Sequence, residues 1–564
     1  MSYIVKQVHG QIRTAIIDAA GRAVSKEQFA PVPLGDFKIE VPANRDFGDF
    51  SVNAAMAWAR DLHMPPKKIA EIILDNIDLA ETLLERCEAA GAGFINFYLS
   101  PAYYAGVVAD VLEKGADYGS SDFGGGKKIN VEFVAANPTG PMHLGNARGG
   151  ALGDCLAAVL EKAGYNVSRE FYVNDAGNQI DKFGLSLDIR YQQLYLGDNA
   201  PELPEDSYHG EDIAVRAKEF ADIYGDKYIA LSEQERRSAL VDYALPENIA
   251  AMKANLTKYR IEYDTWFLES TLHNDGELKD TIELMKAKGL TYESEGALWY
   301  RATEHGGEKD EVLIRANGNP TYFAADIAYH RNKLAVRGFD KAINIWGADH
   351  HGHVARMKGA LDAIGLDGSK LDIILMQLVR LTRDGEVVRM SKRTGKAITL
   401  VDLLEDIPID AVRFLFNMRE PGTQMEFDLD LAVEQSSQNP VYYCQYAHAR
   451  ICSILKKLAG EGKAPRKCSL RELEALGEPE ELELIRHLAA LTDEIISAAR
   501  NYDPAKITRY AVDLATLFHK FYNACRVSCE DEALMQARLS LCLAVKGTIS
   551  NILTMFKINV PESM

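Results

Sequence analysis

The sequence predicts a multidomain α/β protein, in which a parallel-sheet domain lies between an N-terminal α+β module and a C-terminal all-α bundle. The chain has 564 residues, about twice the length at which a single hydrophobic core stops growing. In the middle of the chain, strand-like apolar runs alternate with helical stretches, which is typical of a parallel sheet. After about residue 400, apolar residues recur at helical spacing instead.

The first segment, residues 1–118, is predicted to be the α+β module. Pro66 favours the start of a helix, and the apolar and aromatic run at 94–99 favours a strand. Residues 119–128 are rich in glycine and have the composition of a flexible linker, so we place a domain boundary there. An earlier helix is predicted from apolar residues at helical spacing: Val5, Val8, Ile12, Ile16 and Ile17.

The sheet domain is predicted over residues 129–400. Residues 129–134 are typical of a buried strand, and a Pro/Gly-rich loop and an apolar helix follow them. Further buried strands are predicted at 341–346 and 371–376. The polar, proline-containing span at about 197–260 departs from this alternation, so it is predicted to be a helical insertion.

The last segment, residues 401–564, is predicted to be the all-α bundle. Its apolar residues recur at intervals of three and four, which is the spacing of a buried helix face. The residues that show this spacing include Leu403, Leu404, Val412, Leu415, Phe416, Ile451, Ile454, Leu455, Leu458, Leu514, Phe518 and Phe521.

The composition excludes several classes of protein. Lys and Arg number 63 against 82 Asp and Glu, a net charge of −19, which argues against a protein that coats nucleic acid or anionic membrane over its whole surface. No apolar run is long enough to span a bilayer or serve as a signal peptide, so we expect a cytoplasmic protein with no membrane partner. The eight cysteines include no C-x-x-C pair, so neither a disulfide framework nor a structural zinc site is expected.

A loop and helix start at about 137–146 is the most informative stretch. The predicted strand ends, the backbone turns through proline and glycine, and His143 and Asn146 stand at the start of the next helix. Helix N-termini present unpaired N–H groups that favour phosphate, and Gly145 allows a nucleotide to approach the backbone. The pattern therefore indicates phosphate or nucleotide binding. The alternative is an ordinary turn with a polar capping residue.

A second stretch, residues 380–396, reverses the sign of the chain's charge. It contains six basic residues and only two acidic ones. A basic loop of this kind is suited to the charge that spreads over phosphate oxygens during nucleotidyl transfer. The alternative is a solvated surface segment.

Together and in this order, the two stretches resemble the paired signatures of class I aminoacyl-tRNA synthetases. The first signature is matched at 143–146, where Asn146 stands in place of the second histidine. The second is matched at 389–393, where Arg389 replaces the first lysine and Lys392 occupies the critical lysine position.

Within that class, the chain resembles arginyl-tRNA synthetases over essentially its whole length. This resemblance implies a Rossmann-like catalytic domain, an N-terminal module that contacts the tRNA elbow, and a helical anticodon-binding domain that opens near Asp410–Arg413. The passages that carry it are 136–146, 171–179, 347–353 and 439–450.

The resemblance implies a pocket for the amino acid. Glu132 and Asp326 are the carboxylates expected to hold a guanidinium, which carries five donors in a fixed plane. Tyr322 and Asp326 are four residues apart and so share one face of a helix. For the two carboxylates, the alternatives are an outward-facing strand position and a surface helix position. The full predicted arginine site is Glu132, Asn137, Tyr322, Asp326 and His350.

The resemblance also implies an ATP site, with Mg²⁺ entering as part of the substrate complex. His143, Asn146 and Lys392 are the expected catalytic residues, although Asn146 lacks an imidazole that could take part in proton transfer. No tightly bound metal is expected, because the three histidines at 350–353 cannot all face one ion from a strand-to-helix turn. The predicted ATP-binding residues are Pro138, Gly140, His143, Gly145, Asn146, Gly347, Asp349, Met390, Ser391 and Lys392.

Aromatic residues near the C-terminus are expected to contact the anticodon. Unpaired bases are commonly read by stacking on aromatic rings. Most aromatics at helical spacing are core residues, which is the alternative here. The resemblance points to Tyr443, Tyr446, Tyr522 and the C-terminal Met564 as the contact residues.

The resemblance therefore implies arginine–tRNA ligase activity with ATP, L-arginine and tRNA(Arg) as partners, in a protein expected to be a monomer. Three alternatives remain open at this point. They are a class I synthetase for another amino acid, a small-molecule nucleotidyltransferase, and a catalytically silent RNA-binding relative.

Overall fold

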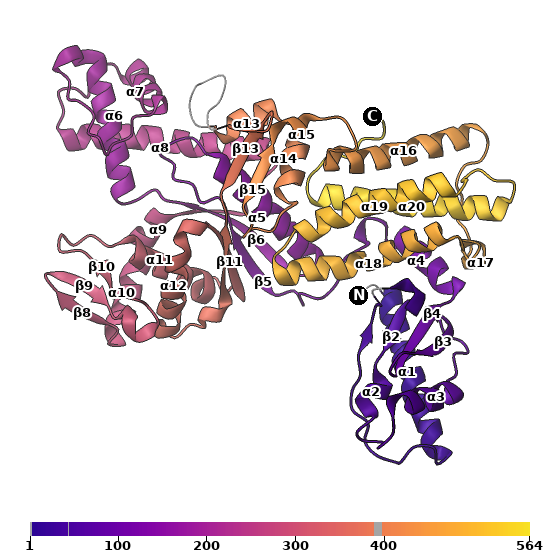
Figure 1. Ribbon diagram of the computed structural model, residues 1–564. Coiled ribbons are helices and arrows are strands. Elements are labelled where there is room, and N and C mark those ends of the chain that lie inside the picture. The colour runs from indigo at the N-terminus through magenta and orange to yellow at the C-terminus, as the bar shows by residue number, and fades with distance from the viewer. Residues whose placement is uncertain (1–2, 43, 389–397) are drawn as a thin grey trace.

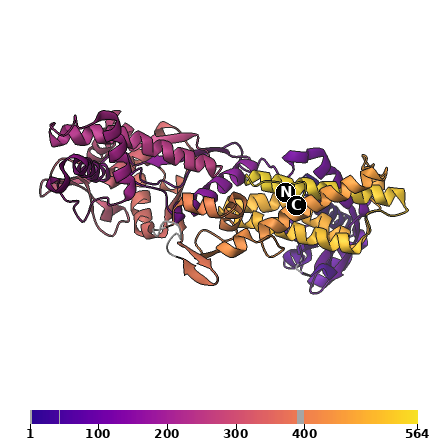
Figure 2. The ribbon, with the colours of Figure 1, turned by 90° about the horizontal axis from the view of Figure 1, so that it is seen from above.

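The computed structural model describes residues 3–42, 44–388 and 398–564 (Figure 1). A parallel sheet lies at the centre, the helical region extends from it on one side, and the N-terminal module lies below that region. Seen from above, the molecule is elongated, with helices α6–α8 at one end and the bundle at the other (Figure 2). This arrangement confirms the predicted fold class.

The N-terminal module is a small antiparallel sheet packed against helices. The strands are β1 (Ile39–Glu40), β2 (Phe50–Val52), β3 (Leu84–Ala90) and β4 (Phe94–Leu99), in the order β1-β2-β4-β3. The helices are α1 (Tyr3–Ser25), α2 (Ala54–Trp58) and α3 (Pro66–Asn76). The predicted apolar stripe of α1 is buried except for Ile17, which is 51% exposed because it lies beside the stripe, about 100° around the helix from Ile16.

The central sheet is parallel, with the order β12-β11-β5-β6-β7 in the described part of the chain. Its strands are β5 (Lys128–Glu132), β6 (Asn166–Val173), β7 (Thr265–Leu268), β11 (Lys341–Gly347) and β12 (Leu371–Met376). The strands predicted at 129–134, 341–346 and 371–376 are confirmed, although β5 ends at Glu132. The chain first proceeds to one side of β5 and later places β11 on its other side, so loops diverge between β5 and β11.

Helix α5 (Leu144–Lys162) crosses the sheet at close range. A Cβ atom at Gly153 would lie 2.1 Å from the ring of Phe133, so glycine permits this approach. The other helices around the sheet are α9 (Glu269–Asn274), α10 (Glu277–Ala287), α11 (Tyr322–Arg331) and α12 (His351–Ile364). A π-helical segment, Asn332–Val336, continues α11. An antiparallel sheet, β10 (Glu311–Ile314), β9 (Ala297–Tyr300) and β8 (Thr291–Ser294), was not predicted from the sequence.

The insertion is helical, as predicted. Helices α7 (Glu211–Tyr224) and α8 (Glu233–Lys258) lie within the span at about 197–260, and α6 (Asn178–Leu196) precedes it and packs against both. These helices share their own buried cluster, which includes Phe183, Tyr191, Phe220 and Leu240.

The bundle consists of long helices and is joined to the sheet by a short mixed region. Its helices are α16 (Pro440–Gly460), α17 (Leu470–Leu473), α18 (Pro479–Asn501), α19 (Ala505–Ala524) and α20 (Glu532–Met555). The mixed region holds β13 (Val379–Arg383), β14 (Glu386–Val388), α13 (Leu400–Asp406), α14 (Ile409–Phe416), β15 (Met425–Asp428) and α15 (Leu429–Val433). Strand β15 pairs with β13, and helical spacing gave no sign of it.

The glycine-rich segment 119–126 is held in place. Its backbone N–H groups at Ser121, Gly124 and Gly126 donate to the carbonyls of Lys162, Ala163 and Gly164, at the end of α5, over 2.8–3.1 Å. Helix α4 (Pro101–Lys114), just before it, packs against α17, α18 and α20 of the bundle. The glycine-rich composition of residues 119–126 predicted a flexible segment, whereas the structure shows a segment that is hydrogen-bonded to the end of α5.

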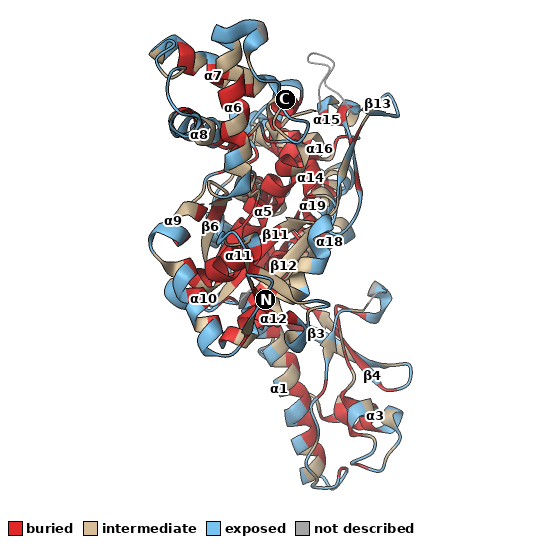
Figure 3. Cartoon of the chain, turned by 90° about the vertical axis from the view of Figure 1, so that its left-hand side faces the viewer, coloured by how far each residue is buried: buried red, intermediate tan, exposed pale blue. Residues whose placement is uncertain are grey.

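Buried residues concentrate on α5, α11, α14 and the central strands (Figure 3). The buried cluster that contains α5 and α14 continues into the N-terminal module and the bundle. Within the described ranges, no helix is long and apolar enough to cross a membrane.

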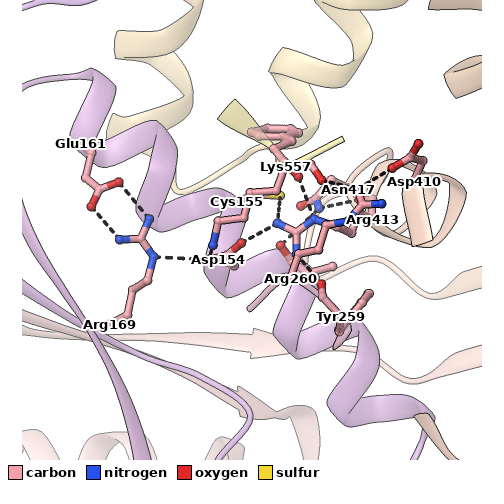
Figure 4. A network of polar contacts seen from close by, with 12 residues as sticks. Asp154, Cys155, Glu161, Arg169, Tyr259, Arg260, Asp410, Arg413, Asn417 and Lys557 are labelled. Atoms are coloured by element: carbon pink, nitrogen blue, oxygen red, sulfur yellow. Dashed lines mark hydrogen bonds and ion pairs between the residues drawn. The ribbon is translucent and has the colours of Figure 1, made fainter. Parts of the chain in front are cut away.

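A buried ionic network joins α5 to the bundle (Figure 4). Arg413 on α14 has a fully buried side chain that contacts the carboxylate of Asp154 on α5. The same guanidinium donates to the carbonyls of Phe556, over 2.7 Å, and Tyr259, over 3.1 Å. Lys557 donates to the other Asp154 oxygen over 2.9 Å. A single carboxylate on α5 thus connects segments that are distant in sequence.

The charge of Asp154 depends on these partners. Burial alone would raise the pKa of Asp154, but Arg413 and Lys557 outweigh burial and hold the pKa below its usual 3.8. Because the folded pKa is lowered, the ion pairs stabilise the fold above the unfolded pKa and lose their contribution as pH falls through the folded value.

We predict that Asp154→Asn lowers the free energy of unfolding by about 3–5 kcal/mol at pH 7, because Arg413 and Lys557 lose their buried counter-charge. Chemical denaturation of both proteins measures the difference. The control is Asp206→Asn, since the Asp206 side chain is 77% exposed in its pair with Lys182 and should contribute at most about 1 kcal/mol. Equal effects of the two substitutions would contradict this assignment.

Candidate active site

Two adjoining cavities open at the carboxyl ends of the parallel strands. Their walls come from the loops after β5, β6, β11 and β12, and both cavities share residues of the β5 and β11 loops. In α/β sheets, ligands bind where neighbouring loops diverge, which here is between β5 and β11. The order of the strands therefore already predicts a ligand site at this position.

The first cavity, of about 560 Å³, brings together the complete predicted arginine site. Residues at its wall include all five predicted positions: Glu132, Asn137, Tyr322, Asp326 and His350. Sequence reasoning missed others that line the same space, among them Tyr172, Asn174, Gln179, Trp346 and His353. Asn174 and Gln179 lie in the 171–179 passage, which was noted only as a resemblance. Trp346 lies near the end of β11, and His353 lies in the first turn of α12.

Asp326 and Tyr322 share one face of α11, as their spacing predicted. The Asp326 carboxylate lies 2.9 Å from Nε2 of His353 on α12 and is 30% exposed. Tyr322, at the first position of the helix, is 40% exposed. Asp326 therefore faces the cavity and has its partner beside it, rather than lying on an outer helix surface.

Glu132, at the end of β5, is only 4% exposed and points away from bulk solvent. Its Oε2 contacts the ammonium group of Lys333, whose side chain is fully buried. The outward-facing strand position considered for Glu132 is thus not what the structure shows. This carboxylate is part of a buried ion pair at the cavity wall.

The backbone after β5 turns through an unusual conformation. Val134 and Ala135 have φ angles of +73° and +44°, in the left-handed region that β-branched residues rarely occupy. Both residues line both cavities. Such strain persists only where surrounding structure enforces it and is concentrated at functional sites.

The second cavity, of about 910 Å³, is lined by the start of α5 and by most of the predicted ATP-binding residues. The predicted residues that line it are Gly140, His143, Gly145, Asn146, Gly347 and Asp349. Pro138 lines neither cavity; its carbonyl accepts from Nδ2 of Asn248 over 2.9 Å. Met390, Ser391 and Lys392 lie outside the described residues, directly after the β13–β14 hairpin.

His143 and Asn146 cap α5 reciprocally. Nδ1 of His143 accepts from the Gly145 N–H over 3.1 Å, and Oδ1 of Asn146 accepts from the His143 N–H over 2.9 Å. A side chain at Gly145 would lie 2.9 Å from the His143 ring, so glycine is required there. Burial lowers the pKa of His143, which keeps the ring neutral with its proton on Nε2. Asn146 thus has a positioning function that needs no imidazole.

Residues of the insertion also line the second cavity. These are Tyr208, Gly210, Asp212 and Ile213, at the start of α7. No sequence motif predicted these four residues, because only the tertiary packing of α6–α8 brings them to the cavity. Met376 and Leu378, by contrast, are identifiable from their position at the end of a parallel strand.

Glu269 lies behind the first cavity, at the start of α9. With its amide nitrogen facing Glu269, Asn174 donates to Oε2 over 3.0 Å. Burial raises the pKa of Glu269 to about 7; the Tyr172 hydroxyl opposes this shift, and the carboxylates of Asp326 and Asp175 add to it. Near neutral pH this carboxyl group therefore exchanges a proton beside the cavity.

The aromatic residues predicted to contact the anticodon gather on α16 and α19. The ring of His519 lies 5.1 Å from that of Tyr443 and 5.9 Å from that of Tyr446. The guanidinium of Arg450 lies 4.5 Å above the ring of Tyr522. Burial, together with Arg450, lowers the pKa of His519 to about 4, so its ring is uncharged at neutral pH. Tyr446 is 40% exposed, which makes this face accessible rather than wholly core.

The C-terminal tail runs beside the same helix. Nδ1 of His448 on α16 donates to the carbonyl of Pro561 over 2.9 Å. Met564 follows this contact and is 51% exposed. The tail therefore brings Met564 to the neighbourhood of α16, remote from the sheet.

The histidines at 350–353 do not form a metal centre. His353 pairs with Asp326, and His350 lies 3.7 Å from Asp349. Across the described ranges, no group of three or more His, Cys, Asp or Glu side chains has an arrangement that could hold a metal ion.

Comparison with known proteins gives a consistent family for every region of the chain. Residues 6–99 match the arginyl tRNA synthetase N terminal domain, residues 107–451 the catalytic domain of class I (R) tRNA synthetases, and residues 444–564 the DALR anticodon binding domain. Arginine–tRNA ligases from Ruminiclostridium cellulolyticum and Caldanaerobacter subterraneus subsp. tengcongensis are each 52% identical over 100% of both chains. The chain belongs to the arginyl-tRNA synthetase family.

The fold agrees with this family. The structure of Thermus thermophilus arginyl-tRNA synthetase superimposes with a TM-score of 0.71 at 23% identity, covering 98% of this chain and 100% of that one. In the present chain, the match to the anticodon binding domain begins within α16, at residue 444, and includes α17–α20 and the tail. The catalytic-domain match includes both cavities.

We predict that Glu269→Gln raises the melting temperature at pH 8 but not at pH 5. The folded pKa of about 7 exceeds the usual 4.5, so the wild-type protein loses stability as pH rises between these values, and glutamine mimics the protonated form. The expected gain at pH 8 is about 3 kcal/mol, or a few degrees. Thermal melts at both pH values measure it, with exposed Glu308→Gln as control. A gain that is the same at both pH values would contradict the assignment.

Proposed function

We propose that this protein is an arginine–tRNA ligase. It activates L-arginine with ATP to form arginyl-adenylate and pyrophosphate, and transfers the arginyl group to the 3′ end of tRNA(Arg). The observation that carries this proposal is the adjacency of the two cavities: one lined by Glu132 and Asp326, the other built on the N-terminus of α5. An amino acid and a nucleotide bound side by side there would meet between β5 and β11.

The first cavity suits a guanidinium. Arginine carries a planar, permanently charged group with five donors, so its pocket needs acceptors in fixed positions. Asp326 supplies a carboxylate and Tyr322 a hydroxyl from one helix face, and Glu132 supplies a second carboxylate from the sheet. Asn137, which lines both cavities, is placed to hold the α-amino or carboxylate end near the nucleotide.

The second cavity suits the triphosphate of ATP. The N-terminus of α5 presents N–H groups and a positive dipole end to it, and His143 offers Nε2–H as a donor. Lys392, by its place in the second signature, supplies the further positive charge. The carboxylate of arginine attacks the α-phosphate in line and pyrophosphate leaves, so catalysis depends on positioning and on charge stabilisation. Mg²⁺ accompanies ATP and neutralises phosphate charge.

The remaining parts of the chain fit the tRNA. Tyr443 and Tyr446 on α16 and Tyr522 on α19 provide stacking surfaces for anticodon bases. Met564 ends the tail that contacts α16. We assign residues 1–118 to the tRNA elbow, 119–128 to a linker, 129–400 to catalysis and 401–564 to the anticodon. We further propose that the protein acts as a cytoplasmic monomer.

We expect the purified protein to charge total tRNA with arginine alone when each labelled amino acid is offered separately with ATP and Mg²⁺. The carboxylates of the first cavity match no other standard side chain as well as a guanidinium. Acid-precipitable label measures the product. Charging with another amino acid would overturn the assignment of Glu132 and Asp326, and no charging would favour a silent RNA-binding protein.

We also predict that Asp326→Asn raises the KM for arginine by about 10- to 100-fold, because a charge-assisted hydrogen bond to the guanidinium is lost. The KM for ATP should change less than about twofold, since Asp326 lines only the first cavity. Steady-state pyrophosphate exchange or aminoacylation measures both constants. Asp280→Asn, on the exposed surface of α10, is the control. Equal increases in both constants would contradict the role of Asp326.

A further inference from the structure

Lys333 lies behind the wall of the first cavity and contacts residues that form that wall. It belongs to the π-helical segment that continues α11, and its side chain is completely buried. Its ammonium group contacts Oε2 of Glu132, lies 3.2 Å from Oδ1 of Asn344, and lies 4.3 Å from the ring centre of Tyr329. Glu132, Asn344 and Tyr329 all line the cavity, whereas Lys333 does not. π-Helical segments are frequently found at functional sites.

The chemistry of the ammonium group fixes the orientation of a chain of side chains. Lysine only donates, so Asn344 must present its oxygen to Lys333 and its nitrogen to Nε2 of His330, 2.9 Å away. Nε2 of His330 is therefore the acceptor, and its Nδ1–H donates to the carbonyl of Asp326 over 2.7 Å. Burial and the nearby Lys333 lower the pKa of His330 to about 4, consistent with this neutral form.

The same ammonium group belongs to a buried cluster of two carboxylates and two cations. Glu132 pairs with Lys333, and Glu170, 3.8 Å from Lys333, pairs with Arg337 and accepts from the Tyr329 hydroxyl. These two carboxylates and two cations balance. Asp326, which pairs with the side chain of His353, lies outside this cluster and faces the cavity.

We propose that Lys333 is a positioning residue for the amino-acid substrate. It pairs with the buried Glu132, occupies one of its carboxylate oxygens, and leaves the other to accept from a guanidinium. The Asp326 carboxylate on α11 then faces a substrate side chain that carries a positive charge. This inference rests on the proposed function, because it concerns how the cavity recognises arginine.

Lys333 and Glu132 are both buried, so each needs the opposite charge of the other. A buried carboxylate without a counter-charge is strongly disfavoured and takes up a proton instead. Removing the ammonium group alone would leave the buried Glu132 carboxylate without its counter-charge, and would release Asn344. Removing both charges together leaves no unpaired buried ion, so the double variant should fold.

The test is a double-substitution cycle with Lys333→Met and Glu132→Gln, read by arginine binding in calorimetry and by steady-state kinetics. We expect Lys333→Met to weaken arginine binding at least about tenfold, with kcat at saturating arginine and the KM for ATP within about twofold. Lys333→Arg, which keeps the cation, should retain most of the affinity. The double variant should bind arginine no more weakly than Glu132→Gln alone, because Lys333 acts through Glu132.

Two results would overturn the proposal: unchanged arginine binding by Lys333→Met, or additive losses in the double variant. Arg337→Gln is the matched control, because it breaks the same buried cluster at Glu170. Among the described residues, the Arg337 side chain has no hydrogen bond or ion pair with a residue of the cavity wall. It should lower the melting temperature while arginine affinity stays within about twofold. Wild-type protein that binds no arginine would overturn the proposed function itself, whereas wild-type binding matched by Lys333→Met would overturn only the role of Lys333.

Discussion

The ion pair between Asp154 and Arg413 is the constraint on which the arrangement of this molecule depends. Asp154 lies on the helix whose first residues line the second cavity, and Arg413 lies on the helix that leads into the bundle. Because both side chains are buried, neither can be left unpaired. The orientation of α5 over the sheet and the attachment of the helical region are therefore determined by the same contact.

The site itself depends on neutral histidines placed among balanced charges. His143 and His330 both have lowered pKa values because they are buried, and each uses one ring nitrogen as an acceptor within the protein. Protonation of either ring would break the hydrogen bond that orients it. The cavities thus keep fixed donors and acceptors near neutral pH. Glu269 is different, because its pKa of about 7 leaves its charge open to change in that range.

Much of this organisation was predictable from the sequence, since strand alternation and helix starts are local properties. The presence of strand β5, the helix that starts after His143 and the shared face of Tyr322 and Asp326 follow from the local pattern of residues, although the strand ends at Glu132 rather than at Val134. The gathering of the five arginine-site residues in one cavity followed from family resemblance. The rest depends on tertiary packing. Neither the pairing of Glu132 with Lys333 across 201 residues nor the strand β15 leaves a local signal.

The C-terminal tail makes the catalytic region dependent on the order of synthesis. Lys557 reaches Asp154 across 403 residues, and Arg413 reaches it across 259. At ordinary rates of translation, about 5–20 residues per second, Asp154 is made roughly 20 to 80 s before Lys557. During that interval α5 cannot bury its carboxylate with a full set of partners. The partners of the Asp154 carboxylate are therefore complete only when the tail beside α16 has been made, so the last residues of the chain help to hold the helix that begins at the second cavity.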